Sequence, residues 1–437
     1  MGDTLCSVGL DVGTTTTQMV VSRLLVENRA NGFSVPEMEI ANREILYRGE
    51  VHFTPLVGDK LVDKEKIRLL VEQEYKNAGI TREQVDTGAV IITGETSRKE
   101  NAKTVLEALS HLAGDFVVAT AGPDLESVLA ARGAGAVDYS EKTGKTVLHM
   151  DIGGGTSNLC LIRGGEIAAT GCLNVGGRLL KFDERGACVY RSPALYFTEE
   201  TDPARLAEMM VQALEMAAGL RPPGALLEHF LTREAGAWTP PTEVPVLSFS
   251  GGVADCVAKE FPAFSFGDMG PVLGQAIKNS ALCRGEYILG RETIRATVIG
   301  AGCHSTKLSG STVFYKNVLF PIKNLPVAEI SRPEDIPSAL QKAEGTVVLS
   351  FSGEGIFHYG QVKELAAQIA AEVPGPVFVA LQADMAKALG HCLCLHLPPD
   401  RPICCIDRVK LSRDSFLDVG APVGPALPVV VKTLILS

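Results

Sequence analysis

The sequence lacks an excess of basic residues, a long apolar run and an export signal. Its 41 lysines and arginines are outnumbered by 51 aspartates and glutamates, so the formal net charge is −10. Nucleic-acid binders usually carry a basic patch or stripe, so this balance argues against nucleic acid as a partner. No apolar stretch approaches the roughly 18 residues of a membrane span, because Pro428 and Lys432 interrupt the apolar C-terminal run. The first residues lack the basic region of a signal peptide, so we expect a soluble cytoplasmic protein with no membrane partner.

Zinc-type cysteine spacing is also absent. Of the eleven cysteines, Cys392, Cys394, Cys404 and Cys405 form the one cluster that suggests a metal, but none of these pairs has C-x2-C spacing. They lie in apolar runs, and free cysteine is commonly buried as a small hydrophobe. We therefore expect reduced thiols in the core, with metal or redox use as the minor alternative.

A P-loop is missing as well. Residues 143–146 read Thr-Gly-Lys-Thr, which matches the end of a Walker A motif. The motif also requires a glycine at position 139, and that position is occupied by a tyrosine. The segment also precedes an expected strand, whereas a P-loop opens a helix. Any nucleotide must therefore be held in another way.

What the chain does contain is an alternation of short apolar strands and helical segments, which predicts an α/β architecture. With 437 residues it is too long for one core, so we expect several domains. We divide it into residues 1–145, 146–310 with a proline-punctuated insertion at about 186–245, and an α/β block at 311–437. The expected helices span residues 60–78, 97–112, 124–135, 203–218 and 361–372, and the expected strands span 7–10, 18–24, 90–93, 116–119, 146–150, 246–250, 347–349, 377–380 and 429–431.

One motif occurs twice, about 140 residues apart. Residues 10–19 read Leu-Asp-Val-Gly-Thr-Thr-Thr-Thr-Gln-Met, and residues 150–159 read Met-Asp-Ile-Gly-Gly-Gly-Thr-Ser-Asn-Leu. Both copies have the pattern of strand, turn and returning strand. A single turn of this kind is typical of any tight hairpin, but its recurrence indicates two related domains that face one another.

Each copy places a carboxylate, Asp11 or Asp151, at the end of a strand and before a turn of small residues. Glycines let backbone N–H groups approach an anion, and hydroxyls add donors, so such turns bind phosphate. A carboxylate beside phosphate is suited to hold magnesium, partly through water. Two facing copies would clamp the β- and γ-phosphates of a nucleotide, with the carboxylates orienting the metal and helping to position an attacking water. The candidate phosphate-binding residues are Gly13, Thr14, Thr15, Thr16, Gly153, Gly154, Gly155 and Thr156.

A strand at 246–250 ends in Gly251 and Gly252 at the start of an expected helix. Paired glycines admit a flat ring against the backbone, which suits adenine or ribose, although any strand-to-helix turn can use them. Two segments rich in glycine and alanine, 127–135 and 296–302, would allow two helices to cross closely, as a hinge between domains requires. Ordinary tight packing is the alternative for each of them.

These five pieces, over residues 5–310, follow an order that resembles the actin, heat-shock-chaperone and sugar-kinase ATPase superfamily. The resemblance implies duplicated ribonuclease-H-like domains with an ATP cleft between them, followed by the α/β C-terminal block. It assigns Asp11 and Asp151 to the phosphate-site aspartates, which are also the magnesium-binding positions. Glu126 lies near the position of a glutamate or glutamine that polarises water in relatives. Residues 93–98 resemble exopolyphosphatases, which makes Glu95 a second candidate.

Within this superfamily the whole chain resembles the ethanolamine ammonia-lyase reactivating factors of bacterial ethanolamine utilisation. Long matches at residues 7–18, 45–49, 91–102, 418–422 and 428–434 carry this resemblance. It implies an ATPase that acts as a chaperone of ethanolamine ammonia-lyase, releasing damaged cobalamin so that intact adenosylcobalamin can rebind. It is also compatible with association with a bacterial microcompartment. The sequence has no cobalamin motif such as D-x-H-x-x-G.

Three other functions stay open at this point. A small-molecule kinase of the same superfamily would need an acceptor pocket with a general base, for which we find no signature. A phosphohydrolase is supported by residues 93–98 alone, and a non-enzymatic actin-like scaffold would form filaments. The sequence is compatible with a homo-oligomer. The residues after 310 and the insertion are the expected partner surfaces, since the nucleotide site needs neither.

Overall fold

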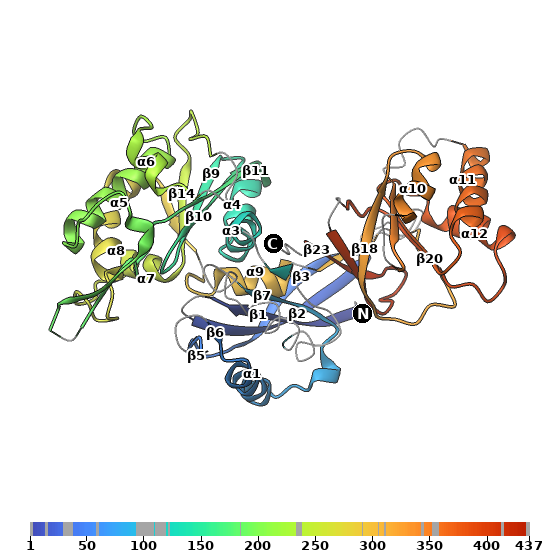
Figure 1. The fold of residues 1–437 in the computed structure, drawn as a ribbon, viewed down its shortest axis with the longest axis horizontal. Helices are drawn as coiled ribbons and strands as arrows, with labels where there is room; N and C mark the ends of the chain where they lie inside the picture. The colour runs from blue at the N-terminus through green and yellow to red at the C-terminus, as the bar shows by residue number, and fades with distance from the viewer. Residues whose placement is uncertain are drawn as a thin grey trace.

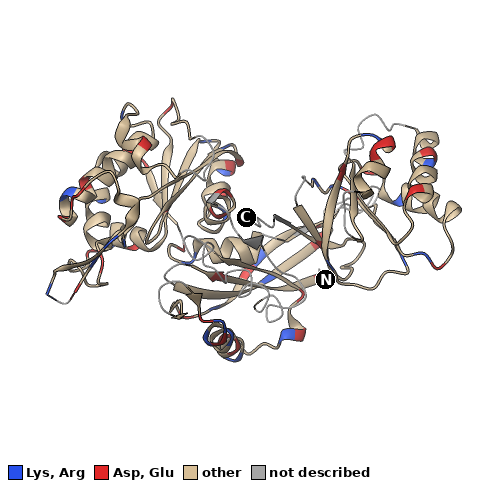
Figure 2. Cartoon of the chain, viewed as in Figure 1, with Lys and Arg blue, Asp and Glu red and all other residues tan. Residues whose placement is uncertain are grey.

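The computed structural model describes residues 3–13, 16–28, 38–57, 61–92, 109, 119–120, 123–183, 185–232, 238–290, 292–304, 306–309, 312–341, 345–351, 358–411 and 415–433. These residues form three lobes, each built around one main β-sheet, and the N-terminal lobe lies between the other two (Figure 1). Charged residues are frequent on the outer helices, such as those of the second and third lobes (Figure 2). The expected helix at 97–112, apart from Leu109, and most of the expected strand at 116–119 lie outside the described residues.

The first lobe contains the described residues from Asp3 to Thr120. Its elements are β1 (Asp3–Val12), β2 (Thr16–Asn28), β3 (Met38–Arg48), β4 (His52–Phe53), β5 (Leu56–Val57), β6 (Leu61–Val62), α1 (Lys64–Ala78), a 3-10 turn (Arg82–Gln84), β7 (Thr87–Ile92) and β8 (Ala119–Thr120). The sheet has the order β3-β2-β1-β7-β8, in which β1 pairs antiparallel with β2 and parallel with β7. One face packs Leu10 and Val12 against Ile67 of α1. Helix α1 begins later than the expected residue 60 because Asp63 caps it, its side chain accepting a hydrogen bond from the Lys66 N–H.

The second lobe begins with helices that cover one face of the second sheet. Its elements are α3 (Pro123–Gly133), α4 (Ala136–Thr143), β9 (Val147–Ile152), β10 (Ser157–Arg163), β11 (Glu166–Leu173), β12 (Leu180–Phe182), β13 (Cys188–Arg191), α5 (Pro203–Ala217), α6 (Ala225–Phe230), β14 (Val246–Ser250), α7 (Gly252–Ala258), α8 (Gly270–Lys278) and β15 (Tyr287–Leu289), with 3-10 turns at Pro193–Leu195 and Ala281–Cys283. The order is β11-β10-β9-β14-β15, with β9 antiparallel to β10 and parallel to β14. The two sheets therefore share one strand order and one set of strand directions around their central strands, as the internal repeat predicts.

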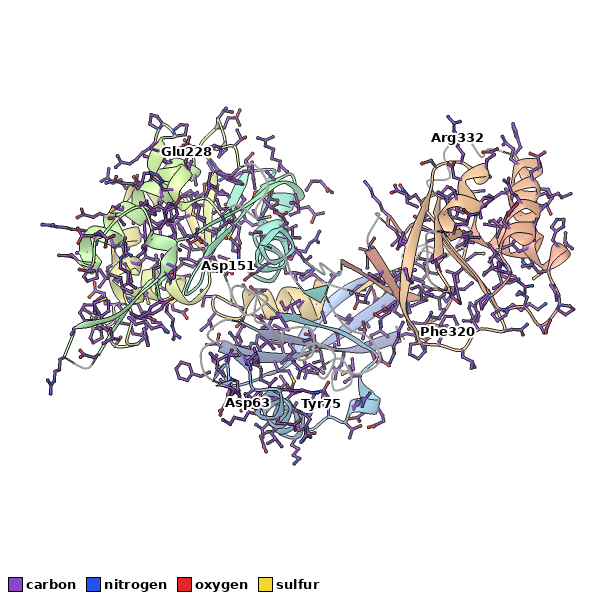
Figure 3. The ribbon with its side chains drawn as sticks, in the orientation of Figure 1. Asp63, Tyr75, Asp151, Glu228, Phe320 and Arg332 are labelled. Carbon is purple, nitrogen blue, oxygen red and sulfur yellow. The ribbon has the colours of Figure 1, made fainter. Side chains whose placement is uncertain are left out.

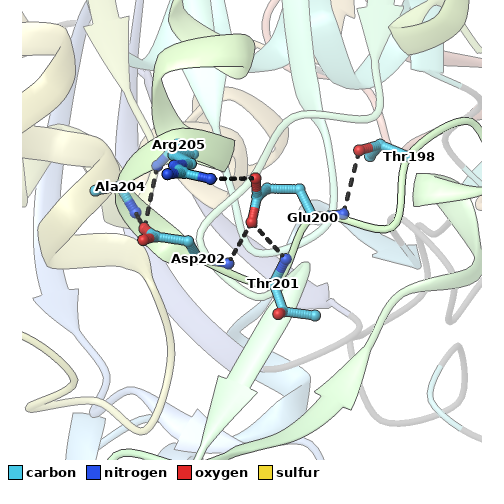
Figure 4. A network of polar contacts seen from close by, with 6 residues as sticks. All are labelled: Thr198, Glu200, Thr201, Asp202, Ala204 and Arg205. Atoms are coloured by element: carbon cyan, nitrogen blue, oxygen red, sulfur yellow. Dashed lines mark hydrogen bonds and ion pairs between the residues drawn. The ribbon is translucent and has the colours of Figure 1, made fainter.

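Helix α5 lies within the segment that the sequence suggests is an insertion. Asp202 caps its N-terminus, because the Asp202 carboxylate accepts hydrogen bonds from the N–H groups of Ala204 at 2.8 Å and Arg205 at 3.3 Å (Figure 4). The Glu200 carboxylate in turn accepts a hydrogen bond from the Asp202 N–H. Its apolar stripe packs into the same core as β9, β10, α7 and α8. The segment thus shares the core of the second sheet, and its outer face alone is available to a partner.

Helix α9 (Ala296–His304) returns the chain from the second lobe to the first and packs on β1 and β2. It crosses α3, which covers the second sheet, at very short range (Figure 1). A Cβ on Gly133 would lie 1.8 Å from the Ala296 carbonyl oxygen, and one on Gly300 would lie 2.0 Å from that of Leu129. Only glycine fits at these two positions, so the close crossing that the small-residue segments predict is present.

The third lobe carries a mixed sheet with a parallel centre. Its elements are β16 (Thr306–Leu308), β17 (Phe314–Lys316), β18 (Ile322–Ile330), a 3-10 turn (Pro333–Asp335), α10 (Ile336–Gln341), β19 (Val348–Phe351), α11 (Tyr359–Glu372), β20 (Val377–Leu381), α12 (Ala386–His396), β21 (Ile403–Ile406), β22 (Ser415–Val419) and β23 (Pro428–Thr433). The order is β16-β23-β22-β18-β19-β20-β21-β17. Helices α10, α11 and α12 share one core with one face of the sheet, and a second core lies on the other face. This lobe can therefore bury apolar residues of its own.

Candidate functional site

The two repeated hairpins have the same register, and equivalent residues close their turns. Asp11 pairs with Gln18 across β1 and β2, and Asp151 pairs with Asn158 across β9 and β10. Each turn is closed by a backbone hydrogen bond of 2.9 Å, from Gly13 to the Thr16 carbonyl in the first and between the equivalent residues in the second. The alignment made from the sequence therefore describes matching three-dimensional positions.

A cleft of about 610 Å³ lies between the two hairpins. It brings together most of the residues singled out from the sequence: Asp11, Gly13, Thr16, Glu126, Asp151, Gly153, Gly154, Gly155, Thr156, Gly251 and Gly252. Thr14, Thr15 and Glu95 lie outside the described residues. Figure 3 shows Asp151 at the base of the second lobe beside α9, where the two lobes meet. The size and mixed lining of the cleft suit a ligand of nucleotide dimensions.

Asp151 is almost fully buried and belongs to a chain of polar side chains. Its carboxylate accepts a short hydrogen bond from the Ser250 hydroxyl and a longer one, 3.5 Å, from Thr297 on α9. Ser250 in turn contacts Nε2 of His149 at 2.9 Å, and Nδ1 of that ring contacts Ser248 at 2.9 Å. Burial raises the pKa of Asp151 to about 6, and the two hydroxyls partly oppose this rise. A nearby cation would therefore strongly favour the ionised carboxylate.

The residues around the two aspartates fit a hydrated magnesium ion. Beside them, Gln18 Oε1 and Asn158 Oδ1 are buried oxygens that have no hydrogen-bond partner among the described atoms. An unpartnered buried acceptor is costly, and water molecules bound to a cation would satisfy both. No group of three metal-ligating side chains occurs among the described residues. Asp11 and Asp151 would thus share the ion with water and phosphate, as magnesium sites commonly do.

The two glycines after β14 differ in their surroundings. Gly251 has φ 84°, and a Cβ there would lie 2.3 Å from the Ile152 carbonyl oxygen, so the turn itself requires glycine. A Cβ on Gly252 would meet nothing nearer than Ile294, at 4.0 Å. Gly252 therefore faces open space in the cleft, which is the position expected for a flat ring.

The loop that follows β11 is not among the residues predicted from the sequence to form the site. Gly177 donates to the Gly153 carbonyl at 3.0 Å, and Arg178 donates to that of Gly154 at 2.7 Å, so the loop lies directly against the second turn. Phe53, Phe261 and Phe266 also line the cleft. The glycine pair before Arg178 was the one available signal, and without the pairing to the distant turn it had no interpretation.

Known proteins are similar to this chain over nearly its whole length. The model of the ethanolamine utilisation protein EutA family matches residues 3–437. The chain belongs to this family. It is 37% identical over 463 residues to the ethanolamine ammonia-lyase reactivase EutA of Salmonella typhimurium and 38% identical over 477 residues to that of Escherichia coli, and each match covers 98% of both chains.

A solved structure of an Aquifex aeolicus Ppx/GppA family member is similar over 68% of this chain and 97% of its own, at 14% identity and a TM-score of 0.42. The resemblance to the reactivating factors is confirmed as membership of the EutA family. The fold expected from the five motifs, two related α/β domains with a cleft between them, is confirmed as well, because the first and second lobes carry sheets of the same strand order on either side of one cleft.

Other features of the chain agree with the expectations or lie apart from the cleft. Cys392, Cys404 and Cys405 are buried, Cys394 is partly buried, and the cysteines are free thiols. The Thr-Gly-Lys-Thr segment ends α4 and leads into β9, and Lys145 pairs with Glu286 at 2.6 Å. Within the described part of the chain, no helix is long and apolar enough to cross a membrane.

Proposed function

We propose that this EutA-family chain is an ATP-dependent reactivase of ethanolamine ammonia-lyase. It would release damaged cobalamin from the inactivated enzyme so that intact adenosylcobalamin can rebind. The observation that carries the proposal is the pair of equivalent carboxylate-bearing hairpins around one cleft, in a chain that matches named reactivases over nearly its full length. We expect it to act in the cytoplasm, in association with a bacterial microcompartment.

In this proposal the cleft binds MgATP. Bound magnesium would neutralise phosphate charge between Asp11 and Asp151. The N–H groups of the two turns would hold the phosphates, and the open face of Gly252 would accept the base. Glu126 on α3 lines the cleft and is half-buried, so it is suited to orient a water molecule toward the terminal phosphate.

Coupling to the lyase would use the crossing of α3 and α9. Each helix packs on one sheet, so closure of the cleft around a nucleotide would move the lobes about this contact. A partner that binds one of the two states more tightly is then driven by ATP. We assign the block 311–437 to partner engagement, because none of the described residues of the third lobe lines the cleft.

The decisive experiment uses the lyase itself. Ethanolamine ammonia-lyase blocked with cyanocobalamin is incubated with the protein, magnesium, ATP and fresh adenosylcobalamin, and recovered lyase activity is measured. We expect recovery that depends on ATP and is absent with ADP. Phosphorylation of a small molecule in place of phosphate release would favour the kinase, and ATP-dependent sedimentation without recovery would favour the scaffold.

The partner surface is tested on the same assay. Leu319 and Leu395 are 92% and 74% exposed on the third lobe. Leu319→Glu and Leu395→Glu together should abolish lyase binding and reactivation while ATP hydrolysis persists. If hydrolysis falls in parallel with reactivation, the third lobe belongs to the ATPase core, and the outer face of the 186–245 segment becomes the candidate surface.

A further inference from the structure

The charge in the cleft is unbalanced for a polyphosphate ligand. Among the described residues that line it, five are acidic and Arg178 alone is a cation. The acidic residues are Asp11, Glu126, Asp151, Asp255 and Asp268. Like charges close together repel one another strongly where water is excluded. Among the described residues that line the cleft, Arg178 is therefore the side chain that can offset the negative charge of phosphate groups, in addition to a bound metal ion.

The backbone places Arg178 beside the second turn. Two hydrogen bonds join the loop to this turn, from Gly177 to Gly153 and from Arg178 to Gly154. A Cβ on Gly176 would lie 2.4 Å from the Gly154 carbonyl oxygen, so only glycine permits this approach. The arginine thus has a fixed position relative to the residues expected to hold phosphate.

Its side chain is held at one end and exposed to the cleft at the other. Arg178 Nε donates to Asp268 Oδ2 at 3.0 Å, and Asp268, 6% exposed, also accepts from the Gly270 N–H at 2.9 Å. The bond to Asp268 uses one of the five guanidinium donors, and the fork of terminal amino groups matches two phosphate oxygens. Asp268 would keep this fork aimed while a ligand binds.

Arg178 also reaches the first lobe. Its Cζ lies 5.8 Å from the ring centroid of Phe53, within the range of a cation–π contact. Phe53 is 75% exposed and pairs with Thr16, the residue that closes the first turn. The backbone of Arg178 therefore lies against the second turn, and its guanidinium lies beside the first. The terminal phosphate of a nucleotide bound by both turns would lie between them.

We propose that Arg178 binds the terminal phosphate of a nucleoside triphosphate and thereby distinguishes the triphosphate from the diphosphate. This inference rests on the proposed nucleotide site and adds a specificity-determining residue to it. With a triphosphate, Arg178 would keep its bond to Asp268 and bind the terminal phosphate, whereas with a diphosphate its contacts would be those with Asp268 and Phe53 alone.

The test compares two nucleotides on four proteins. Wild type, Arg178→Gln, Arg178→Lys and the control Arg163→Ala, which removes an exposed cation at the end of β10, are titrated with ADP and with a non-hydrolysable ATP analogue by calorimetry in excess magnesium. For Arg178→Gln we expect at least about a tenfold loss of affinity for the analogue and less than about a twofold change for ADP. Arg178→Lys should lie between wild type and Arg178→Gln, because lysine keeps the charge without the fork. The control should match wild type.

Unchanged ADP affinity also shows that the variants are folded. Equal losses for both nucleotides, or no loss for either, would overturn the assignment of Arg178 while leaving the nucleotide site intact. A wild type that binds neither nucleotide would instead contradict the proposed function itself.

Discussion

Asp11 and Asp151 occupy equivalent positions in two hairpins with one register, yet their surroundings differ. Asp11 is half-buried, and the residue paired with it on the neighbouring parallel strand is Ile91. Asp151 is 7% exposed, and the residue paired with it in the same way is Ser250, which donates to its carboxylate. The repeat therefore fixes the backbone geometry, while the neighbouring strand places a hydroxyl donor beside Asp151 and an isoleucine beside Asp11.

The largest expected effect tests whether both carboxylates serve one metal. Asp11→Asn and Asp151→Asn should each slow ATP hydrolysis by at least about 100-fold, or roughly 2.7 kcal/mol of barrier, because each removes a negative charge beside the metal. Phosphate release measured across a magnesium titration is the assay, with circular dichroism as the control for folding. Near-normal turnover in both variants would end the proposal that this cleft is the ATPase site.

A second experiment separates the two aspartates by stability. Because burial raises the pKa of Asp151 to about 6, the folded state favours its neutral form. Its contribution to stability is thus complete below pH ~4, the unfolded pKa, and is lost as the pH rises through about 6. In metal-free buffer at pH 8, Asp151→Asn should gain about 2 kcal/mol in unfolding free energy over wild type, with little gain at pH 4. Denaturant titrations at both pH values measure this, and equal gains at the two pH values would contradict it.

The glycines after β14 give the next contrast. Gly252→Val should raise the ATP dissociation constant at least about tenfold by filling the space expected for the base, and should change stability by less than about 2 kcal/mol. Gly251→Val is the matched variant and should lower the thermal midpoint markedly, since its side chain would meet the Ile152 carbonyl. If Gly252→Val binds ATP normally, the base lies elsewhere in the cleft.

The sequence predicts those parts of the structure in which one contiguous motif determines the shape of the backbone. The repeated hairpins, the glycine turn after β14 and the crossing of α3 and α9 are contiguous motifs whose residue types dictate backbone shape. Arg178 and Phe53 could not be assigned in this way, because their roles arise from contacts between segments that are 125 positions apart. The segment at 186–245 has the proline content of an insertion, yet the apolar stripe of α5 completes the second core.

The smallest expected effect concerns the hydroxyl that distinguishes the two sites. Ser250 donates to Asp151, so it must accept from Nε2–H of His149, and Nδ1 of the ring then accepts from Ser248. Burial lowers the pKa of His149 to about 3, so the ring stays neutral and this order of donors is maintained at neutral pH. Ser250→Ala removes one hydrogen bond from the Asp151 carboxylate, which raises its pKa further and should slow hydrolysis about three- to tenfold.

The loss in Ser250→Ala should shrink as the pH rises, because higher pH restores the ionised carboxylate. Ser248→Ala is the matched control, since it shortens the same chain at the far end and leaves the hydrogen bond from Ser250 to Asp151 in place. A pH profile of kcat for the three proteins, at saturating magnesium, measures both effects. If Ser248→Ala and Ser250→Ala slow hydrolysis equally at every pH, the chain only supports packing between β9 and β14, and the difference between the two hairpins has no bearing on the chemistry.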